Sequence, residues 1–101
     1  MIRIILADDH KLLTEGLKSL LEKRSDMEVA GVALDGIEAV EMTLKERPDV
    51  AILDVSMPRL NGIDAARQIL RDLPETKVLM LSMHADRRFV QEALKAIGRA
   101  S

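Results

Sequence analysis

The sequence contains no cysteine, no tryptophan and no tyrosine, and Phe89 is its single aromatic residue. Without cysteine, disulfide bonds and thiolate metal sites are excluded, as is common in cytoplasmic proteins. The scarcity of aromatic rings removes the platforms on which proteins stack the bases of single-stranded nucleic acid. No apolar run approaches the roughly 20 residues needed to cross a bilayer, and the first residues lack the layout of a signal peptide. These absences predict a cytoplasmic protein that makes no membrane contact.

Charges are abundant, but neither sign dominates. Of the 101 residues, 32% are charged and 48% are hydrophobic, and the net charge is −2. This composition is typical of one globular domain with a modest core. No basic stripe is present, so this segment is not expected to bind DNA by itself.

Short apolar runs alternate with longer amphipathic segments. The predicted strands are 2–7, 29–34, 50–53 and 78–81, and amphipathic helices are predicted over 11–23, from 35 onward, after 62, and over 90–97. A βαβαβαβα order predicts an α/β fold with a parallel sheet, right-handed crossovers and helices on both faces.

Three local signals refine the helices. Leu13, Leu17, Leu20 and Leu21 have the spacing of one buried helical face. The segment from Asp35 to Glu38 has the D-x-x-E spacing of a capping box. Gly62 is expected to supply conformational freedom where a loop enters a helix.

Three carboxylates follow two of the predicted strands. Asp8 and Asp9 follow the first strand, and Asp54 follows the third. In a doubly wound sheet these strand ends lie side by side, at the edge where ligands bind. Charges about 4 Å apart repel by roughly 4 kcal/mol at an effective dielectric of 20, so the group needs a cation or a proton. Oxygen ligands of this kind suit Mg²⁺. The plainer alternative is that Asp8 and Asp9 cap a helix and Asp54 begins a turn.

Three separated motifs then carry a family resemblance. They are Asp8-Asp9-His10 after the first strand, Leu53-Asp54-Val55-Ser56-Met57-Pro58 with Asn61-Gly62 after the third, and Leu81-Ser82-Met83-His84 at the end of the fourth. Together they resemble the receiver domains of two-component response regulators, in particular the NarL/FixJ-type class, whose members usually add a helix-turn-helix output domain. The resemblance implies a flavodoxin-like doubly wound sheet with strand order 2-1-3-4.

The resemblance also implies a role for each site residue. Asp54 would accept a phosphoryl group from a sensor histidine kinase, which makes the chain a phosphoacceptor regulatory domain and not an enzyme. Asp9 and Asp54 would bind Mg²⁺ together with the backbone carbonyl of Ser56, while Asp8 would assist through water. Ser82 would turn its hydroxyl toward the phosphoryl oxygens. Two isolated histidines without cysteine make a poor transition-metal site, so His10 is assigned no ligand role.

The sequence departs from the family at its end. A receiver normally has five βα units, with an essential lysine after the fifth strand, and here only four are visible; Lys95 lies in a predicted helix and is no substitute. We therefore expect residues 1–101 to be a C-terminally incomplete receiver without an output domain, through which alone DNA would be bound. The uncharged segment 78–81 would then be an exposed sheet edge, which predicts a homodimer.

Three alternative functions remain open at this point. One is a signalling-inactive fragment that dimerises. Another is a Mg²⁺-dependent phosphatase with an aspartyl nucleophile, although that class generally has a second acid two residues later, where Ser56 stands. The third is a nucleotide-binding module, which is disfavoured because no glycine-rich turn follows the first strand.

Overall fold

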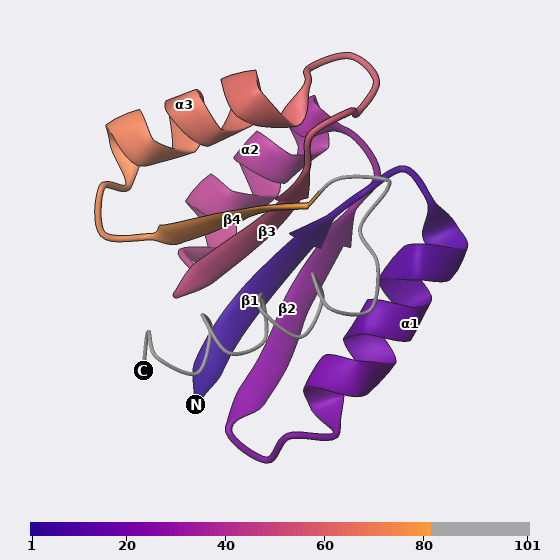
Figure 1. The fold of residues 1–101 in the computed structure, drawn as a ribbon. Coiled ribbons are helices and arrows are strands. Elements are labelled where there is room, and N and C mark those ends of the chain that lie inside the picture. Colours follow the sequence, from indigo (N-terminus) through magenta and orange to yellow (C-terminus); the bar gives the residue numbers. More distant parts are fainter. Residues whose placement is uncertain (82–101) are drawn as a thin grey trace.

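The computed structural model describes residues 1–81. It contains β1 (Ile2–Ala7), α1 (Lys11–Glu22), β2 (Met27–Ala33), α2 (Gly36–Glu46), β3 (Val50–Asp54), α3 (Gly62–Asp72) and β4 (Lys77–Leu81). The four strands are parallel in the order β2-β1-β3-β4 (Figure 1), which confirms the predicted sheet. The helix predicted over 90–97 and the hydroxyl of Ser82 lie outside the described residues.

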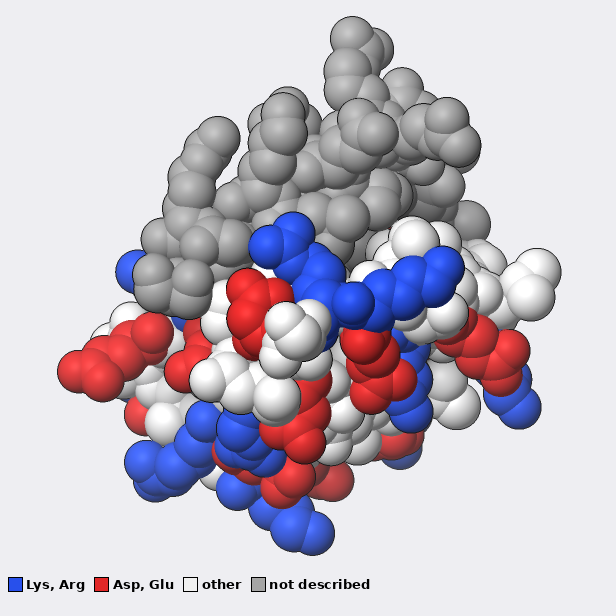
Figure 2. Space-filling model, turned by 90° about the horizontal axis from the view of Figure 1, so that it is seen from below, with Lys and Arg blue, Asp and Glu red and all other residues white. Residues whose placement is uncertain are grey.

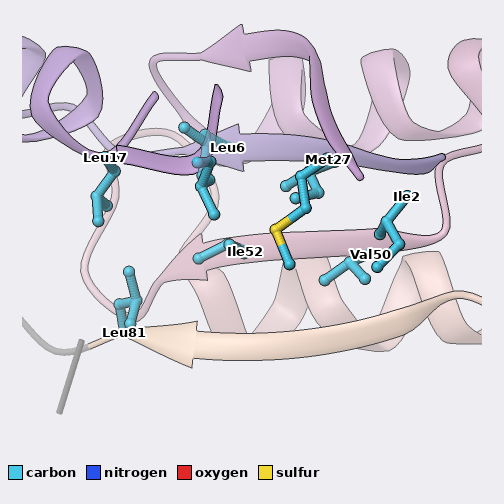
Figure 3. Packing of buried hydrophobic residues seen from close by; sticks show 9 residues of the cluster. Ile2, Leu6, Leu17, Met27, Val50, Ile52 and Leu81 are labelled. Atoms are coloured by element: carbon cyan, nitrogen blue, oxygen red, sulfur yellow. The ribbon is translucent and has the colours of Figure 1, made fainter. Parts of the chain in front are cut away.

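The sheet separates two apolar layers. Helix α1 covers one face, and α2 and α3 cover the other (Figure 1). Between α1 and the sheet, Leu17 and Leu21 pack with Leu6, Ile52 and their neighbours (Figure 3). The opposite layer is rich in alanine, with Ala39 of α2 and Ala65 of α3 fully buried. Strands β1 and β3 are buried along almost their whole length because they lie in the middle of the sheet, covered on both faces.

The buried face of α1 is narrower than predicted. Leu17 and Leu21 are buried as expected, and Thr14 is buried beside them. The predicted burial of Leu13 and Leu20 is wrong, since these side chains are 39% and 46% exposed. Positions 14, 17 and 21 form a single stripe that faces the sheet, and the residue preceding each stripe position is turned about 100° away from it.

The predicted cap of α2 is present. Asp35 is the N-cap residue, and its Oδ1 accepts a hydrogen bond of 2.8 Å from the backbone N–H of Glu38. Asn61 caps α3 in the same way, through Oδ1 and the N–H of Asp64 at 2.9 Å. Both caps fix the point at which a loop from the carboxyl end of the sheet enters a helix.

The surface carries charges of both signs. On the face shown in Figure 2, Lys and Arg side chains are interspersed with Asp and Glu side chains, and neither sign forms a broad patch. This agrees with the balanced composition. Within residues 1–81, no helix combines the length and the apolar character that a membrane span requires.

Candidate functional site

The carboxyl ends of β1 and β3 bring the three predicted acids together. The two strands are parallel neighbours, and their pairing extends to Ala7 opposite Leu53, so the aspartates that follow are adjacent. Asp8 and Asp54 are buried, at 4% and 1% exposure, whereas Asp9 is exposed. One ligand atom from each aspartate and one from His10 lie within 4.8 Å of one another. The convergence predicted from the strand order is therefore confirmed.

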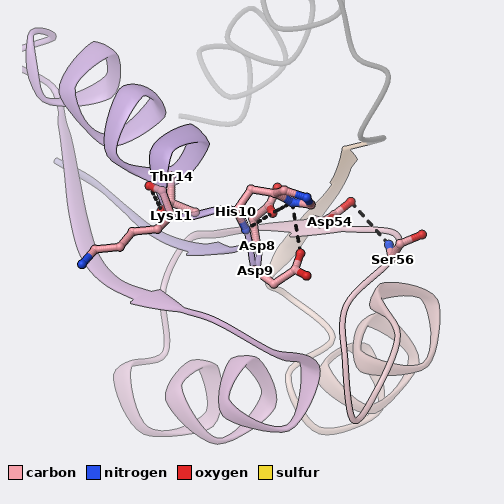
Figure 4. A network of polar contacts seen from close by, with 7 residues as sticks. All are labelled: Asp8, Asp9, His10, Lys11, Thr14, Asp54 and Ser56. Carbon is pink, nitrogen blue, oxygen red and sulfur yellow. Dashed lines mark hydrogen bonds and ion pairs between the residues drawn. The ribbon is translucent and has the colours of Figure 1, made fainter.

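Asp8 and Asp9 are bound to His10 and do not cap α1 (Figure 4). Asp8 Oδ1 accepts a hydrogen bond of 2.7 Å from the backbone N–H of His10 and lies 2.7 Å from its ring Nδ1. Asp9 Oδ1 lies 3.1 Å from the same nitrogen. The N-cap of α1 is His10, whose side chain makes no capping hydrogen bond. The alternative of a purely capping role for the acid pair is thus wrong.

Asp54 holds a buried oxygen without a partner. Its Oδ1 accepts a hydrogen bond of 3.3 Å from the backbone N–H of Ser56, but within residues 1–81 its buried Oδ2 has no hydrogen-bond partner. Burial raises the pKa of this carboxyl above the usual aspartate value, and the neighbouring charge of Asp8 raises it further. A buried acceptor left unpaired costs free energy. The site is therefore suited to a group that supplies bonds to Oδ2, and its carboxylate oxygens fit a hard cation such as Mg²⁺.

The loop after β3 is held close to the Asp54 backbone. The N–H of Gly62 donates to the carbonyl of Val55 at 2.9 Å, and the N–H of Val55 donates to the carbonyl of Leu81 at 2.9 Å. A Cβ atom on Gly62 would lie 1.9 Å from the carbonyl oxygen of Asp54. No glycine within residues 1–81 has a positive φ. The expected reason for Gly62 was therefore wrong: a glycine is needed here for close backbone approach, not for conformational freedom.

The loop also forms an open hollow beside the acids. The hollow has a volume of about 690 Å³, and its lining includes Asp9, His10, Ser56 and Asn61. Ser56 thus lies next to the acid group, and its backbone N–H donates to Asp54 Oδ1. Of the three acids, Asp9 is the one that lines this hollow.

His10, to which the sequence analysis assigned no ligand role, lies in the site. Its side chain is 42% exposed, and its ring is directed into the acid group. The hydrogen bond to Asp8 raises the pKa of the imidazole, and the charges of Asp8 and Asp9 add to this effect. A protonated ring supplies part of the positive charge that the clustered carboxylates require. Its position directly after the acid pair was the available signal.

The comparisons with known proteins show the family of this chain. A sequence model of the response regulator receiver domain matches residues 4–99. The chain belongs to the response regulator receiver domain family. This receiver domain is 42% identical over 94 residues to the transcriptional regulatory protein DegU of Brevibacillus brevis, which covers 93% of the chain and 40% of DegU.

Two solved receiver structures extend the agreement to the fold. The response regulator domain of Thermotoga maritima CheB is 31% identical, with a TM-score of 0.89 and coverage of 99% of this chain and 96% of that one. The signal receiver domain of NarL from Mycobacterium tuberculosis is 35% identical, with a TM-score of 0.75 and coverage of 93% and 76%. The predicted flavodoxin-like, NarL-type receiver domain of a two-component system is confirmed. The chain spans less than half the length of the curated relatives it matches.

Proposed function

We propose that this receiver domain acts as a phosphorylation switch in which Asp54 accepts a phosphoryl group from a sensor histidine kinase. The observation that carries the proposal is the buried Oδ2 of Asp54, which has no hydrogen-bond partner within residues 1–81. The carboxylate is held at the end of β3 by the Ser56 N–H, and Ser56 and Asp9 both line the neighbouring hollow. A fixed nucleophile with one free oxygen is the arrangement that phosphoryl transfer needs.

In the proposed step, an Asp54 oxygen forms a bond to phosphorus while the N–P bond of the donor phosphohistidine breaks. The donor nitrogen leaves with the bonding electrons, and an aspartyl phosphate results. The three aspartates, with the backbone carbonyl of Ser56, are the groups that would hold Mg²⁺. The ion would neutralise the charge of the carboxylates and of the phosphoryl oxygens.

Ser82 has a proposed role in reading the phosphorylated state. It follows Leu81, the last residue of β4, whose carbonyl accepts the hydrogen bond from Val55 in the loop after Asp54. A hydroxyl at this strand end could donate to a phosphoryl oxygen and so couple the chemistry to the segment after β4. The position of Ser82 itself lies outside the described residues.

Phosphorylation can be measured directly as intact mass. We expect acetyl phosphate with Mg²⁺ to add the mass of one phosphoryl group to a small fraction of the native chain, because residues 1–101 lack the lysine that the family places after its fifth strand. Asp54→Asn should abolish the addition because the amide is no nucleophile. Asp26→Asn is the matched control, since Asp26 is an exposed aspartate paired with Arg24. Equal phosphorylation of the Asp54→Asn variant would contradict the proposal.

The location and the role of the regulator that contains this domain are also part of the proposal. DegU is described as a transcriptional regulatory protein. By analogy, the regulator containing this domain would act in the cytoplasm and control transcription through a DNA-binding output domain outside residues 1–101. The phosphatase alternative has less support, because Ser56 stands where that class places its second acid.

A homodimer formed through the β4 side is part of the same proposal. Within the described sheet β4 is an edge strand that pairs with β3 alone, and Val78, Leu79 and Met80 are half-buried. Residues 78–81 of this edge strand carry no charge, which favours pairing with a second chain. Light scattering over a dilution series should give a dimer mass at high micromolar concentration. A monomer mass throughout the series would exclude this assembly.

A further inference from the structure

The ring of His10 occupies the position of a fourth ligand in the acid group. Its Nδ1 lies 2.7 Å from Asp8 Oδ1 and 3.1 Å from Asp9 Oδ1. Figure 4 shows the ring between the carboxylates of the β1 end, on the side that faces Asp54. One ring nitrogen of His10 and one oxygen from each of the three aspartates all lie within 4.8 Å of one another.

The spacing of this set is close to that of ligands around one ion. Metal–nitrogen and metal–oxygen bonds of about 2.1 Å allow two ligands of one ion to be at most about 4.2 Å apart. The widest separation therefore needs to contract by less than about 1 Å. The buried Oδ2 of Asp54, which has no partner within residues 1–81, is an independent sign that the group is open to a ligand.

We propose that His10 Nδ1 is a metal ligand in this site and gives it a preference for divalent transition ions over Mg²⁺. The inference rests on the proposed function, because it uses the same aspartates. Mg²⁺ takes oxygen ligands and keeps its waters, so it gains little from an imidazole. Ions such as Mn²⁺, Co²⁺ and Zn²⁺ bind imidazole well. Coordination through Nδ1 would replace the hydrogen bond between His10 and Asp8 with bonds from both residues to one ion.

A different role of His10 predicts a different result. If the ring served only as a positive charge among carboxylates, its removal would strengthen the binding of every divalent cation by a similar factor. His10→Lys retains a positive charge but removes the imidazole, whereas His10→Ala removes both. Neither change deletes a helix cap, because the His10 side chain makes no capping hydrogen bond.

Calorimetric titration with Mg²⁺ and with Zn²⁺ separates these roles. The measured quantity is the ratio of the two dissociation constants in the native chain, His10→Ala and His10→Lys. Loss of a ligand should reduce the preference for Zn²⁺ by roughly 10-fold or more in both variants. Mg²⁺ binding should persist in His10→Ala. An unchanged ratio in both variants would overturn the inference.

Nitrogen NMR provides a readout that does not depend on affinity. Addition of Zn²⁺ should shift the Nδ1 resonance of His10, which is assigned by its disappearance in His10→Ala. Mg²⁺ should leave the imidazole without a metal–nitrogen bond. An Nδ1 resonance that does not respond to Zn²⁺ while the aspartates do would overturn the ligand role.

The Asp54→Ala variant distinguishes failure of this inference from failure of the proposed function. If the site is as proposed, Asp54→Ala should weaken the binding of both ions. A variant that binds both ions like the native chain would refute the acidic site and, with it, the role of His10. A second outcome would refute the role of His10 alone. In it, Asp54→Ala no longer binds either ion, but the ratio of the Mg²⁺ and Zn²⁺ dissociation constants is the same in the native chain and in the His10 variants.

Discussion

At the residue scale, the chemistry depends on side chains at the carboxyl ends of two neighbouring strands. The positions of Asp8, Asp9 and Asp54 could be predicted because a residue directly after a parallel strand has its location fixed by the strand order. The position of His10 directly after the acid pair was a signal that it lies near the site, but the direction of its ring depends on a side-chain rotation that the sequence does not determine. The role of Gly62 was missed for a related reason, since a backbone contact with Asp54 appears only after the loop has folded back.

The charge of Asp54 should reduce the stability of the metal-free domain. Its raised pKa means that the folded protein takes up a proton here more readily than the unfolded chain. The ionised carboxylate therefore costs stability above the folded pKa, and this cost disappears as the pH falls through that value. Asp54→Asn should raise the free energy of unfolding at neutral pH by about 1 to 4 kcal/mol, the repulsion between charges about 4 Å apart at dielectrics of 80 to 20.

Urea denaturation without metal, repeated from neutral to acidic pH, measures this effect. The advantage of Asp54→Asn should be largest at neutral pH and should shrink in acid. A variant that is less stable than the native chain at neutral pH, or an advantage that grows in acid, would show that the buried charge of Asp54 does not destabilise the fold.

At the element scale, the loop between β3 and α3, which follows Asp54, is in contact with the start of α2. Arg59, at a positive φ of 66°, places its guanidinium nitrogen 2.8 Å from Asp35 Oδ2. The same aspartate caps α2 through its Oδ1. A Cβ atom on Gly36 would lie 1.8 Å from the carbonyl oxygen of Leu60, so the loop and the helix are in close backbone contact. The cap was predictable from its spacing, whereas the link to Arg59 joins residues too distant in sequence to be inferred.

The ionised form of Asp35 should stabilise the fold. Hydrogen bonding from the Glu38 N–H lowers the pKa of Asp35, and Arg59 lowers it further. The stability it contributes is present above its ordinary pKa and is lost as the pH falls through the lowered, folded value. Asp35→Asn, which keeps an oxygen for the cap, should cost less than Asp35→Ala, and both should flatten the acid side of the stability curve. Denaturation midpoints between neutral and acidic pH provide the measurement, and an unaltered acid side in both variants would contradict it.

Two glycines in helices should respond in opposite ways to the same substitution. Gly62→Ala would force a Cβ atom against the Asp54 carbonyl, and we expect a loss of roughly 1 to 3 kcal/mol. Gly16 lies within α1, and among residues 1–81, apart from the helix's own backbone, a Cβ atom there would have no neighbour within 4 Å. Gly16→Ala should therefore stabilise by about 0.5 to 1 kcal/mol through helix propensity. Thermal unfolding of both variants tests the pair, and a destabilised Gly16→Ala with an unaffected Gly62→Ala would contradict the packing described.

At the scale of the whole molecule, the alternation of strands and helices was sufficient to predict the architecture. Right-handed crossovers and two buried central strands leave few arrangements for four βα units, and the observed order β2-β1-β3-β4 is the predicted one. The amphipathic faces were predicted less well, as Leu13 and Leu20 demonstrate, because exposure depends on how wide a stripe each helix buries. The fold thus places Asp8 and Asp54 together whatever the details of the helix surfaces.

Binding of beryllofluoride, a mimic of an aspartyl phosphate, tests the central claim most directly. Fluorine NMR detects the bound species as resonances separate from free fluoride. The account predicts bound resonances in the native chain and in Asp26→Asn when Mg²⁺ is present, and none in Asp54→Asn or without a divalent ion. Bound resonances that persist in Asp54→Asn would contradict the assignment of Asp54 as the phosphoacceptor.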